Sequence, residues 1–379
     1  MGSLEMDSLE IEGGIPLNGD IYVSGAKNAA LPLLAAGLMC DGTLTLTHVP
    51  DLTDTRLMIE LLGHHGLKIG FQDGLVSMIG PATNMDAPYD LVSKMRASIL
   101  VLGPLLARYG GARVSLPGGC AIGTRPVDLH IRAMQKLGAT VELADGYIQA
   151  RAPKGLTGNK IVFPFVSVGA TENAMMAAVC ASGTSQIVNV AREPEITDLA
   201  NCLNAMGARI TGQGTDTLTI EGVTSLSSAT HQVVADRVEA GTFIMAAAMS
   251  GGSLTVRDII PHHLDALFDV IRQTGVGIDV GDNFVTVTAD GRYKAQNVET
   301  QAYPGFPTDL QAQFTAMMCL ANGVSQISET IFENRFMHVP ELVRMGADIS
   351  VDGRTAVIRG KEALLAAPVM ATDLRASVS

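Results

Sequence analysis

Apolar and polar positions along this chain follow a pattern that recurs about every 70 residues. In each copy, an apolar stretch long enough for a helix ends at a glycine, and a short strand of alternating apolar and polar residues follows. A glycine there is typical of the C′ position, where a left-handed residue ends a helix. A second glycine precedes another short strand upstream. The terminal glycines are Gly66, Gly138, Gly207, Gly275 and Gly346, and the upstream ones are Gly42, Gly111, Gly183, Gly252 and Gly323.

Each copy also begins with a second, almost uncharged helix, which indicates burial against sheets. These helices start near residues 27, 96, 168, 237, 308 and 373. Six N-termini directed at one cleft would form an anion-binding centre, because helix dipoles favour negative charge there. Five cations near helix starts would add full charge: Lys27, Arg96, Arg125, Arg237 and Arg375. Any one of them alone is better explained as a solvated surface residue, but their recurrence in successive units favours the binding interpretation.

The units therefore predict an α/β protein of about six βαβαββ-like repeats, divided three and three into two domains. We expect residues 27–234 to form the first domain. Residues 1–26 and 235–379 would form the second, with a first strand at 9–23 that crosses over to it. Only the beginning of a sixth unit is present, so the second domain is expected to be C-terminally incomplete.

Composition narrows the class of protein. Apolar residues make up 47% and charged residues 17% of the chain, as in a globular protein. The net charge of −12 argues against a nucleic-acid partner, although a local basic cluster would still hold a small anion. No apolar run predicts a membrane span and no signal peptide is evident, which indicates a cytoplasmic protein. The five cysteines contain no CxxC pair, which fits a reducing compartment, and no metal-ligand spacing is visible.

One glycine-rich stretch, residues 116–130, carries the most chemistry. It places Cys120, Arg125, Asp128 and His130 close together, and Pro126 is suited to the first turn of a helix. A thiol beside a cation and a helix N-terminus is polarised towards the reactive thiolate. The other interpretation is a surface turn with a half-buried cysteine, and spacing alone does not separate the two.

Five segments together resemble the enolpyruvyl transferases, in particular those that act on UDP-N-acetylglucosamine. The segments are Ser-Gly-Ala-Lys27-Asn28-Ala-Ala-Leu-Pro, Pro-Gly-Gly-Cys120-Ala-Ile-Gly-Thr-Arg125-Pro-Val-Asp128-Leu-His130, Ala-Arg-Glu193-Pro-Glu195-Ile, Phe-Pro-Thr-Asp309-Leu-Gln-Ala-Gln-Phe and Phe332-Glu333-Asn334-Arg335-Phe-Met-His338. The resemblance runs from about residue 9 to the last residue. It implies two domains of the inside-out α/β barrel type, in agreement with three repeats per domain.

The resemblance also implies an activity. It is the transfer of the enolpyruvyl group of phosphoenolpyruvate to the 3-hydroxyl of UDP-N-acetylglucosamine, with release of phosphate, as the first committed step of peptidoglycan biosynthesis. No metal or organic cofactor is implied. The antibiotic fosfomycin is expected as a covalent inhibitor at Cys120. Neither nucleic acid nor membrane insertion is expected.

Roles for individual residues follow from the same resemblance. Cys120 would act as proton donor and form an adduct with phosphoenolpyruvate, and Asp309 would be the general base on the sugar hydroxyl or its positioning partner. The phosphoenolpyruvate site would consist of Lys27, Asn28, Arg125, Arg335 and Arg375. The UDP-sugar site would consist of Arg96, Arg125, Pro126, Val127, Asp128, Leu129, His130, Phe165, Val166, Ser167, Val168, Asp309 and Ile331. Position 165 departs from the family, because many relatives have lysine there.

Alternatives stay open at several positions. The alternative for Asp309 is a plain helix N-cap, and the alternative for His130 is packing at the start of its helix. Glu193 and Glu195 would either brace the domain interface or touch ligand. Two other functions compete: the shikimate-pathway enolpyruvyl transferase, against which the cysteine loop speaks, and a non-catalytic UDP-sugar-binding paralogue.

Overall fold

The computed structural model describes residues 8–116 and 127–371. Within these residues, five four-stranded sheets share one strand order. In each sheet an edge strand pairs in parallel with a second strand, and a β-hairpin extends the sheet antiparallel to that second strand. In spatial order, one sheet contains β13 (Ala229–Gln232), β2 (Thr43–Thr47), β4 (Leu75–Ile79) and β3 (Lys68–Gln72), and a second contains β5 (Asp86–Ala87), β6 (Gly111–Ser115), β8 (Tyr147–Arg151) and β7 (Thr140–Ala144). A third contains β9 (Lys160–Val162), β10 (Thr184–Val188), β12 (Thr217–Glu221) and β11 (Arg209–Thr211). A fourth contains β1 (Leu17–Tyr22), β14 (Gly252–Arg257), β16 (Phe284–Ala289) and β15 (Gly277–Val280), and the fifth contains β17 (Val298–Glu299), β18 (Val324–Ser328), β20 (Thr355–Arg359) and β19 (Asp348–Asp352).

Two kinds of helix accompany each sheet. One precedes the second strand of its sheet: α1 (Lys27–Ala36), α4 (Leu102–Tyr109), α6 (Val168–Val179), α8 (Arg237–Ser250) and α10 (Gln311–Met318). The other precedes the hairpin: α2 (Thr53–His64), α5 (Asp128–Lys136), α7 (Pro194–Ala205), α9 (Asp265–Thr274) and α11 (Val339–Arg344). Short helices are α3 (Tyr89–Val92), η1 (Gly37–Met39), η2 (Arg96–Val101), η3 (Pro261–Leu264) and η4 (Thr308–Leu310). The α/β fold with repeated units is confirmed.

The terminal glycines behave as the pattern predicts. Their φ angles are 110° at Gly66, 95° at Gly138, 108° at Gly207, 93° at Gly275 and 91° at Gly346, all in the left-handed region. A residue with a Cβ adopts this region only at an energetic cost, so glycine is favoured at each of these turns. The left-handed ends of all five helices are therefore confirmed.

The almost uncharged helices are buried, as their composition predicts. Every residue from Ala170 to Val179 in α6 is buried, and so is every residue of α10. A helix that is apolar all round has no face for water and must lie inside the protein. By contrast, α9 buries only Leu267, Phe268, Ile271 and Thr274, which is the pattern of an amphipathic helix over a core.

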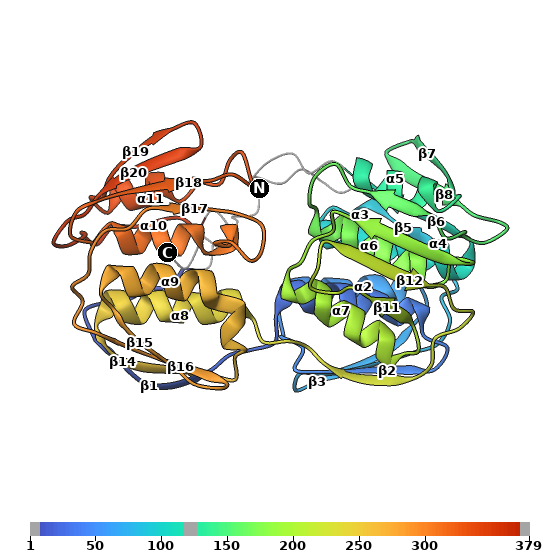
Figure 1. The fold of residues 1–379 in the computed structure, drawn as a ribbon, viewed down its shortest axis with the longest axis horizontal. Coiled ribbons are helices and arrows are strands. Elements are labelled where there is room, and N and C mark those ends of the chain that lie inside the picture. Colours follow the sequence, from blue (N-terminus) through green and yellow to red (C-terminus); the bar gives the residue numbers. More distant parts are fainter. Residues whose placement is uncertain (1–7, 117–126, 372–379) are drawn as a thin grey trace, which may run out of the picture.

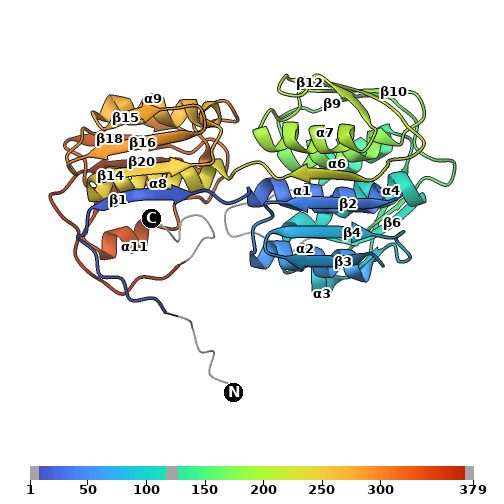
Figure 2. The same ribbon diagram turned by 90° about the horizontal axis from the view of Figure 1, so that it is seen from below.

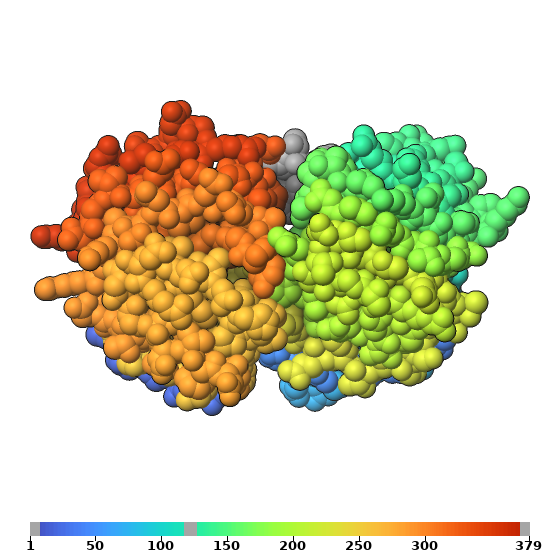
Figure 3. Space-filling model, in the orientation of Figure 1, coloured from blue at the N-terminus to red at the C-terminus, as the bar shows by residue number. Residues whose placement is uncertain are grey.

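Two hydrophobic cores divide the described chain into two lobes (Figure 1). The first core draws on residues between Ala26 and Val233, and the second on Val23 and on residues between Val238 and Ile358. We call these parts the first and second lobes. The sheets and helices lie in layers within each lobe (Figure 2). The lobes touch in the middle of the space-filling view and a notch separates them at its lower edge (Figure 3).

Two strands are exchanged between the lobes. β1 precedes α1 in the chain but pairs with β14 of the second lobe, whereas β13 precedes α8 but pairs with β2 of the first lobe. The two crossing segments form an antiparallel bridge between Gly25 and Ala235. A Cβ at Gly25 would lie 1.8 Å from the carbonyl oxygen of His48, so only glycine fits where the chain crosses.

The first strand is shorter than the sequence predicts. It begins at Leu17 instead of residue 9, and residues 9–16 are exposed and have no regular secondary structure. Leu17 pairs with Gly252, the first residue of β14. The residue before it, Gly251, is the C-cap of α8 and not part of a strand. Residues before Leu17 therefore have no strand to pair with, and the expectation of a strand over 9–23 was wrong at its N-terminal end.

Candidate active site

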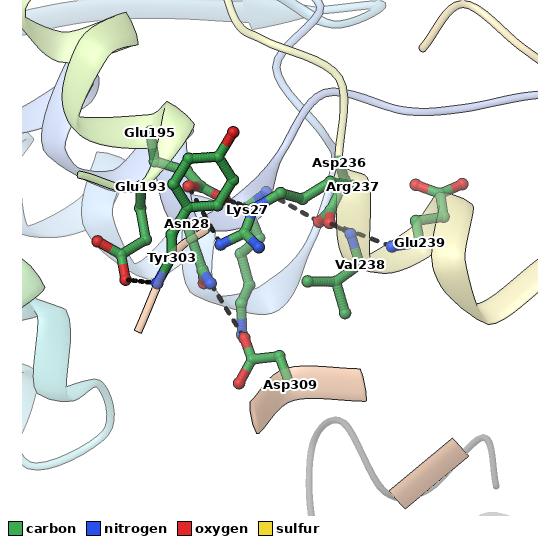
Figure 4. Close-up of polar contacts among 10 residues, drawn as sticks. All are labelled: Lys27, Asn28, Glu193, Glu195, Asp236, Arg237, Val238, Glu239, Tyr303 and Asp309. Atoms are coloured by element: carbon green, nitrogen blue, oxygen red, sulfur yellow. Dashed lines mark hydrogen bonds and ion pairs between the residues drawn. The ribbon is translucent and has the colours of Figure 1, made fainter. Parts of the chain in front are cut away.

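Asp236 joins the N-termini of α1 and α8 at the crossing between the lobes. Its Oδ1 accepts hydrogen bonds from the backbone N–H groups of Val238 (2.8 Å) and Glu239 (3.1 Å), which caps α8. Its Oδ2 accepts from the backbone N–H of Lys27 at 3.4 Å. Glu239 accepts in turn from the backbone N–H of Ser24 at 3.2 Å. The first turns of both helices are therefore held together, as the close-up shows (Figure 4).

Asp309 lies between the two lobes and contacts a residue of each. Asn28, in the first turn of α1, donates through Nδ2 to Oδ2 of Asp309 at 3.2 Å. Arg335 pairs with the other carboxylate oxygen, with 2.7 Å between Nη2 and Oδ1. The Arg335 side chain is only 7% exposed, whereas Asp309 is 24% exposed. Three residues expected in one site, far apart in the sequence, thus meet across the lobes.

Lys27 is held by an acidic residue that the sequence analysis did not identify. Its Nζ lies 3.0 Å from Oδ2 of Asp54, and both side chains are mostly buried. Asp54 stands in the first turn of α2. An aspartate so close to a helix N-terminus has an ordinary explanation in the helix dipole, so the sequence offered no signal of a contact with Lys27.

The N-terminus of α7 brings two carboxylates to the same junction. Arg237 donates from Nε and Nη2 to the two oxygens of Glu195, at 3.1 Å and 3.4 Å, and stacks over the ring of Tyr303, 5.6 Å from its centroid. The backbone N–H of Tyr303 donates to Glu193 at 3.4 Å. Glu193 and Glu195 belong to the first lobe and both partners to the second, so these contacts favour the interpretation that the two glutamates brace the interface.

A third carboxyl group, Glu172 on α6, is close enough to Glu193 and Glu195 to interact with their charges. Burial raises its pKa well above the ordinary value, and the neighbouring charges of Glu195 and Glu193 raise it further. Burial also raises the pKa of Glu193. The side chain of Glu172 is 4% exposed. Its surroundings therefore favour the neutral form of the carboxyl group over the ionised form.

His130 is buried in the first lobe, at 8% exposure. Its Nδ1 lies 2.9 Å from Nδ2 of Asn173, and since that amide nitrogen can only donate, the ring nitrogen accepts. Burial above all, and the Arg96 cation in second place, lower the pKa of His130 to about 4, against an opposing effect of Asp128. The imidazole is therefore neutral. Packing at the start of a helix, one of its two interpretations, accounts for these contacts.

The other residues expected at the UDP-sugar site fall into exposed and buried groups. Phe165 and Ile331 are 55% and 39% exposed, and Val166 is exposed as well. Ser167 caps α6 by accepting from the N–H of Ala170 at 3.4 Å, and Val168 begins that helix. Val127 and Asp128 lie at the start of α5, whereas the Leu129 side chain is buried in the first core. Arg96 begins η2.

Four expected site residues, Cys120, Arg125, Pro126 and Arg375, lie outside the described residues. Among the described ones, no group of three or more His, Cys, Asp and Glu side chains is arranged to hold a metal ion. None of the described helices combines the length and the apolar character needed to cross a membrane.

The cations and helix N-termini around Asp309 form a site with a defined chemistry. Lys27 and Arg335 each have a carboxylate partner in this structure. An anionic ligand that binds there would take the place of such a carboxylate as the partner of the cation. Asp309 accepts hydrogen bonds and so can orient a hydroxyl group or take its proton. The starts of α1, α8 and η4 meet at this junction. This is the arrangement expected of an enzyme that binds a small anion and activates an alcohol.

Residues 11–379 match the family model described as EPSP synthase (3-phosphoshikimate 1-carboxyvinyltransferase). The chain therefore belongs to this family of enolpyruvyl transferases. It is similar to the crystal structure of the enolpyruvyl transferase NikO from Streptomyces tendae, with a TM-score of 0.84, 24% identity, and 97% of this chain and 88% of that chain covered. That similarity supports the fold alone.

Two relatives are more similar in sequence, and both are named UDP-N-acetylglucosamine 1-carboxyvinyltransferase. The protein of Gluconacetobacter diazotrophicus is 54% identical over 377 residues, which cover 99% of this chain and 90% of the relative. The protein of Allorhizobium ampelinum is 55% identical over 387 residues, with 99% and 90% covered. The resemblance found in the sequence motifs is confirmed.

Proposed function

We propose that this chain transfers the enolpyruvyl group of phosphoenolpyruvate to the 3-hydroxyl of UDP-N-acetylglucosamine and releases phosphate. The observation that carries the proposal is the Asp309 carboxylate, held between Asn28 of the first lobe and Arg335 of the second. The name of relatives that are 54% identical over nearly the whole chain supports the choice of acceptor.

The reaction is an addition followed by an elimination. The sugar oxygen bonds to C2 of phosphoenolpyruvate while its proton passes to Asp309, and the electrons of the double bond take up a proton at C3. A tetrahedral ketal results. The bond from C2 to the phosphate oxygen then breaks, and loss of a proton from C3 restores the double bond. Asp309 suits the first step because one of its oxygens is oriented by Arg335 and the other by Asn28.

Cys120 is proposed as the acid that protonates C3. A thiol whose pKa is tuned near neutrality can donate a proton to carbon or add as a thiolate. The same nucleophilicity makes Cys120 the proposed site of alkylation by fosfomycin. Arg125 belongs to the same proposal, since a cation beside the thiol favours its ionised form.

Phosphoenolpyruvate is proposed to bind among Lys27, Asn28, Arg125, Arg335 and Arg375. Its phosphate and carboxylate groups require cations, and Lys27 and Arg335 are held within the junction by carboxylates. Charge neutralisation there also stabilises the oxygens on which charge develops during elimination.

The nucleotide sugar is proposed to bind along the first lobe, with its acceptor hydroxyl at Asp309. The exposed Phe165 and Val166, at the N-terminus of α6, offer an apolar surface and backbone donors. Ile331 would contact the sugar from the second lobe. Arg96, Ser167, Val168 and residues 125–130 complete the proposed UDP-sugar site.

The lobes support a proposal for the domains. We assign residues 27–234 to one domain and residues 1–26 and 235–379 to the other, in line with the two hydrophobic cores. Each is proposed to be an inside-out α/β barrel of βαβαββ units, and a sixth unit would begin at about residue 372, outside the described residues. The activity proposed here would commit material to peptidoglycan in the cytoplasm.

Phosphate release tests the proposal. The chain is incubated with phosphoenolpyruvate alone, with UDP-N-acetylglucosamine added, and with shikimate 3-phosphate added instead. Variants C120A and D309N are measured beside C180A, a matched control because Cys180 caps the C-terminal end of α6, opposite the end at Ser167 that the proposed sugar site uses. We expect release only with the nucleotide sugar, a fall of about 100-fold or more in C120A and D309N, and parental activity in C180A.

Each other outcome contradicts part of the proposal. Release that requires shikimate 3-phosphate would assign the acceptor of the rival enzyme. Binding of the nucleotide sugar without release would favour a non-catalytic binding protein. Unchanged activity in C120A would remove the proposed proton donor.

A further inference from the structure

Glu329 is a fully buried acid that the proposed reaction does not use. It follows β18 directly and is 1% exposed. Its carboxylate accepts four hydrogen bonds: at Oε1 from the Thr300 hydroxyl (3.0 Å) and from the backbone N–H groups of Ile331 (2.8 Å) and Phe332 (3.0 Å), and at Oε2 from the Thr308 hydroxyl (2.8 Å). Three of these bonds end on Oε1 and one on Oε2, so both oxygens of the carboxylate are held by the protein.

The backbone contacts of Glu329 fix the turn that leads to Arg335. Oε1 accepts from the N–H groups two and three residues further along, as a side chain does when it caps a turn. Thr300, which directly follows β17, supports the same turn, because its hydroxyl also accepts from the N–H of Thr330 at 3.0 Å. The position of Ile331, an expected sugar contact, therefore depends on Glu329.

The second oxygen of Glu329 connects to the site through one hydroxyl. Thr308 donates its proton to Oε2 of Glu329, which leaves its oxygen lone pairs to accept from Nη1 of Arg335 at 3.2 Å. The other terminal nitrogen of Arg335 pairs with Asp309. Because Glu329 fixes the direction of the Thr308 hydroxyl, the oxygen of Thr308 must face the guanidinium.

We propose that Glu329 is a positioning residue: through Thr308 and the turn at 331–332, it sets the orientation of Arg335 and thereby of Asp309. The inference rests on the proposed function for its consequences, though not for its geometry. Arg335 has its two terminal nitrogens fixed by different partners, Thr308 and Asp309. A planar guanidinium held at both ends cannot rotate, and this restricts the carboxylate that it contacts.

Three variants test the connection, and each changes few atoms. T308V replaces a hydroxyl by a methyl group of similar size and removes both hydrogen bonds of that hydroxyl, the one to Glu329 and the one from Arg335. T308S keeps the hydroxyl and should rescue. E329Q keeps one carbonyl oxygen for the two backbone donors and offers an amide N–H to Thr308, which reverses the direction of that hydrogen bond. T355V is a matched control, because the hydroxyl of Thr355 bonds to the hydroxyl of Ser328 in the same sheet, at 3.3 Å, instead of to Glu329.

Steady-state kinetics and chemical modification are measured on the whole chain. We expect T308V and E329Q to lower kcat by about 10- to 100-fold and to raise the KM for phosphoenolpyruvate, with the KM for UDP-N-acetylglucosamine within about threefold. A partly unfolded preparation would lower the apparent kcat and change neither KM. Phenylglyoxal should modify Arg335 several times faster in both variants than in the parent. T308S and T355V should match the parent in every measurement.

The readouts separate this inference from the proposed function. If the parent is active, kcat tests the inference, and a kcat of T308V within about threefold of the parental value would overturn it. If the parent is inactive, the proposed function fails, and the modification rate of Arg335 tests the inference instead. Equal rates in the parent and T308V would then overturn the inference, and a faster rate in T308V with T308S at the parental rate would support it.

Discussion

Replacing Arg237 by methionine should destabilise the interface between the lobes, because it removes the cation from a buried acidic junction. The Arg237 and Glu195 side chains are 11% and 5% exposed. They form two charge-assisted hydrogen bonds, at 3.1 Å and 3.4 Å, across the interface. Methionine keeps most of the apolar contact with Tyr303 and none of the charge. The variant therefore leaves the Glu195 carboxylate buried without its partner.

The magnitude follows from what the variant leaves behind. Removing one partner of a buried ion pair destabilises a protein by about 3–5 kcal/mol, because the remaining charge stays buried without compensation. We therefore expect R237M to lose about 3–5 kcal/mol of its free energy of unfolding at pH 7.

Urea unfolding followed by circular dichroism measures this loss at pH 7. Tryptophan fluorescence is no alternative, since the chain has no tryptophan. The double variant E195Q/R237M removes both charges and should recover most of the loss, to within about 1.5 kcal/mol of the parent. The reasoning would be refuted if R237M lost less than about 1 kcal/mol at pH 7, or if the double variant were no more stable than R237M.

Three further predictions concern the junction and the crossing. In G25A the new Cβ would meet the His48 carbonyl oxygen at 1.8 Å, so we expect the free energy of unfolding to fall by more than about 3 kcal/mol, or no soluble protein. A soluble variant that melts within a few degrees of the parent would contradict this expectation. Burial raises the pKa of Glu172, so the folded state keeps this group neutral while the unfolded chain ionises it above its ordinary pKa. The stability of the parent should therefore fall by up to about 1.4 kcal/mol per pH unit above pH 4.5 relative to E172Q, and an equal difference between the two proteins at pH 5 and pH 7 would count against it. K27A should raise the KM for phosphoenolpyruvate at least about tenfold, whereas D54N, which removes the charged partner 3.0 Å from Lys27, should change this KM less. Isothermal titration of phosphoenolpyruvate in the presence of the nucleotide sugar provides a second measurement. A K27A variant with the parental affinity for phosphoenolpyruvate would exclude the proposed contact.

The sequence by itself determined the repeat, because the signals involved are local. A glycine that ends a helix must supply a left-handed residue whatever surrounds it, and Gly66, Gly138, Gly207, Gly275 and Gly346 all do so. Buried helices need apolar residues on every side, and α6 and α10 have them. The motifs around Asn28, Asp309 and Arg335 named the family and the chemistry, since these residue types stand in recognisable local contexts.

The tertiary structure decided which of these local features meet. The exchange of β1 and β13 between the lobes has no local signature, because either strand fits the edge of either sheet by its own pattern. The need for glycine at position 25 likewise depends on the backbone of His48, which packs against it only in the folded protein. The contacts of Lys27 with Asp54 and of Thr308 with Glu329 and Arg335 join residues from different elements. Such contacts depend on distances between elements, which a one-dimensional pattern does not contain. Burial likewise made His130 a neutral residue of the interior, because desolvation is a property of its surroundings and not of the histidine.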